Sequence, residues 1–269
     1  IGAAVKDGYD AGHGLPFDSE GMKERYPGIF FSQFTGAELV ADKWNLSRED
    51  LDQFALESHQ KASNATELKY FDREILPVKG KNAEGIEDLV MADEGIRFDA
   101  SLDKLAGLNP VTEGGKITAG NASQITDGAA AVLICNDAGL KKIKSNPRAE
   151  IVSISVVGDD PVFMLTGPIP ASHKALEYAK LSIDDMDIYE VNEAFAPVPL
   201  AWAEELKADR SKLNVNGGAM ALGHPLGATG AKLMTTMLHE LERREGKYAL
   251  QAICEGGGTA NATIIKRVN

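Results

Sequence analysis

Residues 229–266 read TGAKLMTTMLHELERREGKYALQAICEGGGTANATIIK. Apolar residues recur at helical spacing from Thr229 to Arg244, which predicts a long amphipathic helix. Two apolar runs follow, at 248–254 and 260–266, and the glycine-rich sequence EGGGT joins them. Two strand-like runs separated by so short a link indicate adjacent strands. A helix followed by paired strands favours an α/β layered domain.

The same alternation extends upstream of this stretch. EIVSISVV at 150–157 and IYEV at 188–191 have strand character. Helices are predicted from Pro170 to about Lys180, from Ser182, and over Ala196–Leu206. The fold class predicted for residues 147–269 is therefore α/β.

The first 120 residues have a less regular hydrophobic pattern. Residues 1–33 show no clean periodicity, and residues 79–118 are polar and broken by glycine and proline. Helices are predicted from Thr35 and after Ser47, whose hydroxyl can cap the chain. EILPV at 74–78 is predicted as a strand. This part is expected to be irregular and partly helical.

Composition and charge narrow the functional classes. The 269 residues are 43% hydrophobic and 25% charged, with a net charge of −12, which excludes a disordered tail and disfavours nucleic acid as a partner. No apolar run reaches the length of a membrane span. The opening sequence IGAAVKDGYDAGHG lacks the features of a signal peptide. Two cysteines are too few for a disulfide framework, so a cytoplasmic location is expected.

Three segments at the ends of predicted strands are candidates for chemistry: VNEAFA at 191–196, NVNGGAMALGHPLGATG at 214–230, and CEGGG at 254–258. In the second segment, His224 lies between glycines that allow a ligand to approach the backbone. Imidazole titrates near neutral pH and can act as a base. The alternative is a buried histidine with satisfied hydrogen bonds, and the glycine context favours the catalytic interpretation.

Cys254 is a second candidate, because the glycines after it offer backbone N–H groups that can hold an oxyanion. A buried, inert thiol is the alternative, and Cys135 fits that description. Asn192 can hold a water or a carbonyl, or cap a strand end. Glu193 is expected in the first turn of a helix. The glycine-rich segment lacks the lysine of a phosphate-binding loop, and the cysteines and histidines show no metal-ligand spacing.

These three segments, in this order, resemble the C-terminal signatures of the thiolase family. Three further stretches also resemble thiolase segments: ITAGNASQITDGAAA at 117–131, TGPIPA at 166–171, and residues 35–78, which include SREDLDQFALESHQKA. GHPLGATG resembles the degradative 3-ketoacyl-CoA branch, which acts in fatty acid β-oxidation. The resemblance implies a thiolase-like layered fold with a loop domain at 1–123, a segment at 124–146 that completes an N-terminal domain, and a C-terminal domain at 147–269.

The resemblance also implies residue roles. His224 would activate the nucleophilic cysteine and line the first oxyanion hole, in which Asn192 would orient a water. Cys254 would move the proton at the acetyl Cα, and Gly256 would donate its N–H to a second oxyanion hole. Three further residues would contact the substrate, the first two along the pantetheine arm and the third at the acyl pocket: Ala119, Ser123 and Phe195.

The implied activity is that of an acetyl-CoA C-acyltransferase, which cleaves 3-ketoacyl-CoA with CoA through an acyl thioester. CoA is a cosubstrate, no metal or other cofactor is implied, and a homodimer or homotetramer is expected. The nucleophilic cysteine is expected in an N-terminal segment that this sequence does not contain, so the chain alone is expected to be inactive. Two alternatives stay open: a non-catalytic acyl-CoA-binding piece, and one half of a split thiolase.

Ser32 and Gln33 stand where many family members have His-Met, and Glu255 and Thr259 replace the more usual residues around Cys254. Relatives that act on bulkier acyl chains or on steroid-derived chains can carry a similar CEGGG ending, so the resemblance is compatible with both short and bulky acyl substrates.

Overall fold

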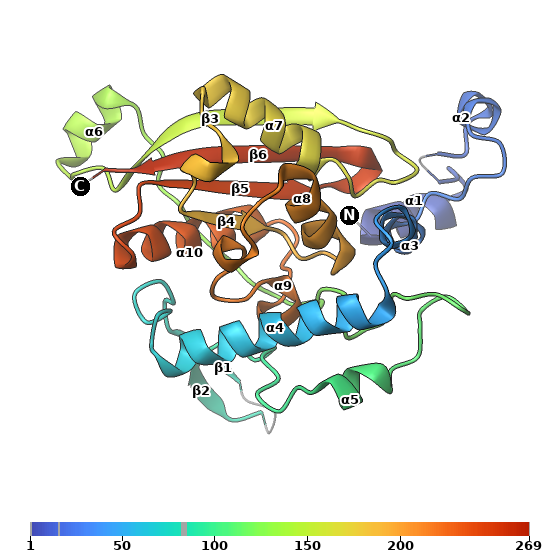
Figure 1. The fold of residues 1–269 in the computed structure, drawn as a ribbon, viewed down its shortest axis with the longest axis horizontal. Helices are drawn as coiled ribbons and strands as arrows, with labels where there is room; N and C mark the ends of the chain where they lie inside the picture. Colours follow the sequence, from blue (N-terminus) through green and yellow to red (C-terminus); the bar gives the residue numbers. More distant parts are fainter. Residues whose placement is uncertain (1, 16, 82–84, 269) are drawn as a thin grey trace.

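The computed structural model describes residues 2–15, 17–81 and 85–268. Its centre is a four-stranded mixed sheet in the order β3-β6-β5-β4 (Figure 1). The strands are β3 (Ala149–Gly158), β4 (Ile188–Val191), β5 (Tyr248–Cys254) and β6 (Thr259–Arg267). β6 pairs antiparallel with both β3 and β5, whereas β4 and β5 are parallel. The α/β class and the paired strands predicted at the C-terminus are confirmed.

Helices cover both faces of this sheet. On one face, α7 (Pro168–Ala179) packs against β3 and β6, and α8 (Pro197–Leu206) adds Trp202 to the same core. On the other face, α10 (Thr229–Arg243) packs against β4 and β5. Side chains alternate along each strand, so Tyr189 enters the first core and Ile188 the second. Both faces of β4 and β5 are therefore buried.

The N-terminal part is built around two amphipathic helices, α3 (Gln33–Lys43) and α4 (Arg48–Glu67). α4 begins at the predicted cap, where Ser47 and Asp50 form a reciprocal capping box. The buried residues of α4 include Leu51, Phe54, Ala55, Ser58 and Ala62. The helix packs against α9 (Ala219–Leu222), while α3 packs against α8 (Figure 1). The N-terminal helices are thereby attached to the sheet domain.

Several shorter elements complete this part of the chain and its connections. They are α1 (Gly2–Asp10), α2 (Glu20–Arg25), β1 (Val78–Lys81), β2 (Glu87–Val90), α5 (Leu102–Ala106), α6 (Asp137–Ile143), η1 (Ile183–Asp185) and η2 (Arg210–Lys212).

Two local predictions are wrong. The segment 74–77 is not a strand, because Leu76 is 81% exposed and no neighbouring strand pairs with it among the described residues. Pairing begins only at Val78, where β1 and β2 form an antiparallel two-stranded sheet. The helix predicted after Ser182 is limited to the single turn of η1.

The segment that joins the two halves has no regular structure between residues 123 and 136. It carries exposed apolar side chains, with Ile125 fully exposed and Leu133 and Ile134 mostly so. Cys135 is also exposed, so the expectation of a buried thiol at this position is wrong. Contiguous exposed apolar side chains of this kind usually mark a surface that another structure covers. Among the described residues, no helix has the length and apolar character that a bilayer crossing requires.

Candidate active site

Three of the predicted residues meet at one edge of the sheet. Asn192 directly follows β4 and Cys254 ends β5, and these two strands are parallel neighbours. Their carboxyl ends therefore reach the same edge, where α/β folds commonly place functional groups. The Asn192 N–H donates to the Ala252 carbonyl at 3.0 Å, so it continues the ladder of β4 and β5. His224 approaches this edge from the loop between α9 and α10.

Hydrogen bonds on both sides define the state of the His224 ring. Nδ1 lies 2.6 Å from the Thr229 hydroxyl, which itself donates to the Pro225 carbonyl at 3.2 Å. We assign the single hydroxyl proton of Thr229 to the bond with Pro225, and with this assignment Thr229 accepts from Nδ1–H. This leaves Nε2 as an acceptor, and the Asn192 side-chain amide lies 3.4 Å from it. The network thus assigns the tautomer with an unprotonated Nε2.

The electrostatic surroundings keep this ring neutral. Burial lowers the pKa of His224, and the positive charge of Lys232 lowers it further. Because the pKa falls below its usual value near 6.5, the ring is unprotonated at neutral pH. His224 is therefore arranged as a base whose Nε2 lone pair points toward the Asn192 side-chain amide.

Cys254 is suited to donating a proton, whereas His224 is suited to accepting one. Its side chain is buried, and burial raises the pKa of the thiol to about 12. A thiol with this pKa stays protonated at neutral pH and is a poor nucleophile. It can still act as a proton donor to a strong base such as a carbanion. Among the described residues, Cys254 makes no hydrogen bond to His224 or Asn192.

The loop after Cys254 supplies an open backbone surface. Gly256–Gly258 form the short helix η3, in which Gly257 and Gly258 have φ of 74° and 82°. Gly256 is exposed, and a Cβ added there would meet nothing within 4 Å. The space on the Cβ side of Gly256 is therefore open.

The residues predicted to contact substrate lie beside the VNEAFA segment. Ala122 forms an antiparallel bridge with Phe195, and the Ser123 N–H donates to the Ala194 carbonyl at 2.9 Å. Phe195 is buried and packs edge-to-face against Phe34, with ring centroids 5.4 Å apart. Ala119 is exposed at the start of the same segment. Ser123 and Phe195 are thus close in space to the sheet edge that carries Asn192.

Glu193 is not the first-turn acid of a helix, and this prediction is wrong. Its carboxylate is 1% exposed and accepts hydrogen bonds from Ser58 Oγ at 2.7 Å, Asn214 Nδ2 at 2.8 Å and the Met220 N–H at 3.1 Å. Burial raises the pKa of Glu193, and these three bonds oppose the rise. The side chain ties α4, β4 and the glycine-rich segment together.

The contact with Glu193 explains why position 218 of that segment is a glycine. A Cβ there would lie 2.2 Å from the Glu193 carboxyl carbon, which three hydrogen bonds hold in place. Only a residue without a side chain lets the loop approach this carboxylate. The sequence feature that could have predicted this contact is the acid in VNEAFA together with the adjacent glycines in NVNGG.

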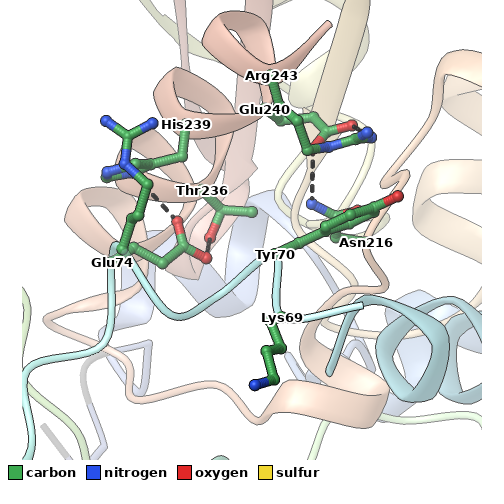
Figure 2. Close-up of a pocket in the computed structure, with 9 residues that line it drawn as sticks. Lys69, Tyr70, Glu74, Asn216, Thr236, His239, Glu240 and Arg243 are labelled. Atoms are coloured by element: carbon green, nitrogen blue, oxygen red, sulfur yellow. Dashed lines mark hydrogen bonds and ion pairs between the residues drawn. The ribbon is translucent and has the colours of Figure 1, made fainter. Parts of the chain in front are cut away.

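A separate polar pocket of about 110 Å³ lies farther along α10, where the chain after α4 packs against it (Figure 2). Arg243 lies 3.8 Å above the Tyr70 ring centroid and pairs with Glu240 at 2.6 Å. Glu74 accepts from Thr236 at 3.1 Å and lies 3.4 Å from His239. These contacts join the segment after α4 to the helix whose first residue holds His224.

In the parts of the chain that the structure describes, no group of three or more His, Cys, Asp and Glu side chains is arranged to hold a metal ion.

Comparison with known protein families accounts for nearly the whole chain. Residues 19–138 match the thiolase N-terminal domain, and residues 145–267 match the thiolase C-terminal domain. The chain belongs to the thiolase family. The two thiolase matches are separated by residues 139–144.

Individual thiolases resemble this chain over most of its length. It is 52% identical over 269 residues to a steroid 3-ketoacyl-CoA thiolase of Mycobacterium tuberculosis, covering 100% of this chain and 65% of that protein. It is 46% identical over 231 residues to a mitochondrial 3-ketoacyl-CoA thiolase of Rattus norvegicus, covering 86% and 58% respectively. The chain thus spans roughly three fifths of the length of these relatives.

Solved thiolase structures share the fold. The human mitochondrial 3-ketoacyl-CoA thiolase superposes with a TM-score of 0.84 at 45% identity, covering 87% of this chain and 59% of that one. An acetyl-CoA acetyltransferase of Bacillus anthracis gives a TM-score of 0.85 at 40% identity, covering 90% and 61%. The thiolase-like layered fold is therefore confirmed.

Proposed function

We propose that the protein carrying this chain is a CoA-dependent acyltransferase of thiolase type. It cleaves 3-ketoacyl-CoA with CoA, to give acetyl-CoA and a shortened acyl-CoA. The observation that supports this function most directly is the state of His224. Thr229 holds Nδ1–H and leaves Nε2 unprotonated beside Asn192, at the sheet edge where Cys254 also lies. Relatives named 3-ketoacyl-CoA thiolase and acetyl-CoA acetyltransferase support the same reaction class.

In the first half-reaction, Nε2 of His224 accepts the proton of a nucleophilic cysteine thiol. We assign that role to neither Cys135 nor Cys254. The sulfur attacks the 3-keto carbon, and the C2–C3 bond breaks with its electron pair moving to C2. The Cys254 thiol donates its proton to C2, which releases acetyl-CoA and leaves an acyl thioester. Asn192 orients a water toward the first oxyanion, and the Gly256 N–H donates to the second.

In the second half-reaction, CoA attacks the acyl thioester. The CoA thiol proton passes to the Cys254 thiolate, and His224 returns its proton to the departing cysteine sulfur. Both residues are then in their starting states, so atoms and charges balance over the cycle.

Substrate contacts and assembly complete the proposal. Ala119 and Ser123 contact the pantetheine arm, Phe195 forms a wall of the acyl pocket, and CoA is a cosubstrate with no further cofactor. The resemblance to the family supports the division at residues 123 and 146, and also a homodimer or homotetramer in the cytoplasm. The matching mitochondrial relatives make the location a point to test.

The test compares two half-reactions in the intact protein. His224→Ala should lower acylation by about 10²–10⁴-fold, because it removes the base. Cys254→Ala should accept an acyl group from a simple acyl-CoA yet fail to cleave the carbon–carbon bond, because transthioesterification moves no proton at carbon. Single-turnover labelling followed by mass spectrometry measures acylation, and a thiolysis assay measures cleavage. Suitable substrates are short, long and steroid-derived 3-ketoacyl-CoA thioesters.

Cys135→Ala is the matched control, since Cys135 is an exposed thiol with no assigned role. It should retain both activities. Normal thiolysis by Cys254→Ala would contradict the division of roles, and absence of thiolysis in the unmodified protein on all three substrates would contradict the function.

A further inference from the structure

The turn between β5 and β6 places three glycines close to Cys254. Cys254 is opposite Ala260 in the antiparallel register. The next residue, Glu255, donates its N–H to the Thr259 carbonyl at 2.9 Å. This bond closes a loop that contains only Gly256–Gly258. Glycine has the widest backbone freedom of any residue, so a loop of three glycines keeps one conformation only where other groups hold it.

Two side chains hold the first glycine of this loop. The Thr259 hydroxyl lies 3.1 Å from the Gly256 carbonyl oxygen and 3.2 Å from Oε2 of Glu255. A hydroxyl has one proton, so the two acceptors share it. Nδ2 of Asn261 donates to Oε1 of Glu255 at 2.6 Å. Thr259 and Asn261 are two residues apart on β6 and project from the same face of the strand. The Glu255 carboxylate is therefore fixed beside the turn by donors from one strand.

The far end of the loop is attached to the segment after β3. The Asp159 N–H donates to the Gly258 carbonyl at 2.7 Å, and the Asp159 carboxylate accepts from Thr166 Oγ1 at 2.6 Å. Gly258 is buried with φ of 82°, and a Cβ added there would lie 2.9 Å from the Asp159 carbonyl oxygen. Gly258 is thus fixed by backbone packing, whereas Gly256 is exposed and is held by side chains.

These contacts limit the direction of the Gly256 N–H from both sides. On the N-terminal side, Glu255 is attached through its own N–H and through its carboxylate. On the C-terminal side, the Gly256 carbonyl accepts from the Thr259 hydroxyl. The N–H and the carbonyl belong to one residue, so a bond that fixes the carbonyl also restricts how far the N–H can turn.

We propose that Thr259 and Glu255 are positioning residues, whose hydrogen bonds at the glycine turn hold the Gly256 N–H in the direction that binding an oxyanion requires. The inference rests on the proposed function, in which this N–H donates to the second oxyanion. The resemblance to thiolases gave neither residue a role. Neither side chain needs to touch the substrate, because both act through Gly256.

The expected kinetic effect follows from where the negative charge is present. An oxyanion forms during the reaction and is absent from the bound substrate, so a misdirected N–H weakens the transition state more than the ground state. Such a change lowers kcat and leaves KM nearly unchanged. Complete loss of one oxyanion donor lowers kcat about 10²–10³-fold. A donor that is present but less well directed should therefore cost less, about tenfold.

The first experiment measures thiolysis by the intact protein. Thr259→Val keeps the shape of the side chain but cannot donate to the Gly256 carbonyl, so it should lower kcat about tenfold with KM within about twofold. Thr259→Ser retains the hydroxyl and should restore most of kcat. Glu255→Ala should also lower kcat, whereas Glu255→Gln can still accept from Asn261 and should not. Thr263→Val, at a half-buried threonine of the same strand, is the matched control.

The second experiment requires no turnover and follows the backbone amides of isotope-labelled glycine by NMR. Gly256→Ala identifies the Gly256 signal. In the unmodified protein its order parameter should be about 0.85, the value of rigid backbone. In Thr259→Val it should fall to about 0.6 or lower, as in flexible backbone. The Gly258 amide should stay rigid in both proteins, because Asp159 still holds that end of the loop.

A flexible Gly256 amide in the unmodified protein would overturn the proposal. It would also be overturned if folded Thr259→Val retained the order parameter or the kcat of the unmodified protein, or if KM alone changed. Absence of thiolysis in the unmodified protein would count against the proposed function. The order parameters would still decide whether Thr259 positions Gly256, so the two failures are distinguishable.

Discussion

The side-chain amide of Asn214 donates a hydrogen bond to the carboxylate of Glu193 at 2.8 Å, deep in the core. The same amide group also pairs with the backbone of Val191 in both directions, each at 2.9 Å. Asn214 therefore attaches the start of the glycine-rich segment to the end of β4. The positions of Asn192 and His224 depend on this buried polar cluster as much as on the sheet.

Glu193→Ala should destabilise the fold strongly. It leaves donors from Ser58, Asn214 and Met220 buried without an acceptor, and each such loss costs about 1–3 kcal/mol. We expect a decrease of about 3 kcal/mol or more in the free energy of unfolding, measured by urea denaturation. Glu204→Ala, an exposed glutamate on α8, should change it by less than about 0.5 kcal/mol. Equal effects of the two variants would contradict the structural role of Glu193.

Gly223→Ala should disturb the loop that carries His224. Gly223 has φ of 79°, and an added Cβ would lie 2.4 Å from Thr126. A side chain in this backbone conformation costs about 1–2 kcal/mol before any clash is counted. Gly227→Ala, in the same loop, meets nothing within 4 Å and is the matched control. We expect a lower melting temperature for Gly223→Ala alone; similar melting of both variants would be evidence against this explanation.

Thr229→Val should impair His224 without emptying the site. The valine keeps the shape of the side chain but cannot accept the Nδ1–H bond of 2.6 Å. Loss of a bond worth about 1–2 kcal/mol predicts a roughly 5- to 30-fold lower acylation rate. Thr229→Ser retains the hydroxyl and should stay close to the unmodified rate. If Ser and Val variants were equally slow, the methyl group rather than the hydroxyl would be what positions His224.

The two cysteines should differ sharply in alkylation. At pH 8, a Cys254 pKa of about 12 leaves about one thiolate in ten thousand, and the side chain is buried, whereas Cys135 is exposed. Iodoacetamide followed by peptide mass spectrometry should modify Cys135 at least about a hundredfold faster. Because the group ionises as pH rises toward 12, the Cys254 rate should increase about tenfold per pH unit between pH 8 and 10. A Cys254 rate that is flat over this range would show that ionisation does not limit it.

Much of the local structure can be predicted because its causes are local. The periodicity of α10, the cap of Ser47 and the apolar runs of β4, β5 and β6 all act over a few residues. Glu74–Val78 shows the limit of this argument. It has strand character, yet a strand forms only where another strand supplies partners, and none lies beside residues 74–77 in the described structure.

The sequence by itself determined the α/β class, the thiolase family and the three segments that carry Asn192, His224 and Cys254, because strand ends and glycine-rich turns are visible in the order of residues. Their catalytic roles stay predictions. Only the tertiary structure decided that the Thr229 hydroxyl lies 2.6 Å from Nδ1 of His224 and that Glu193 is a buried anchor. Ser58 and Glu193 are 135 residues apart, and no local pattern encodes such a pairing. Burial and hydrogen bonding at that separation are determined by packing.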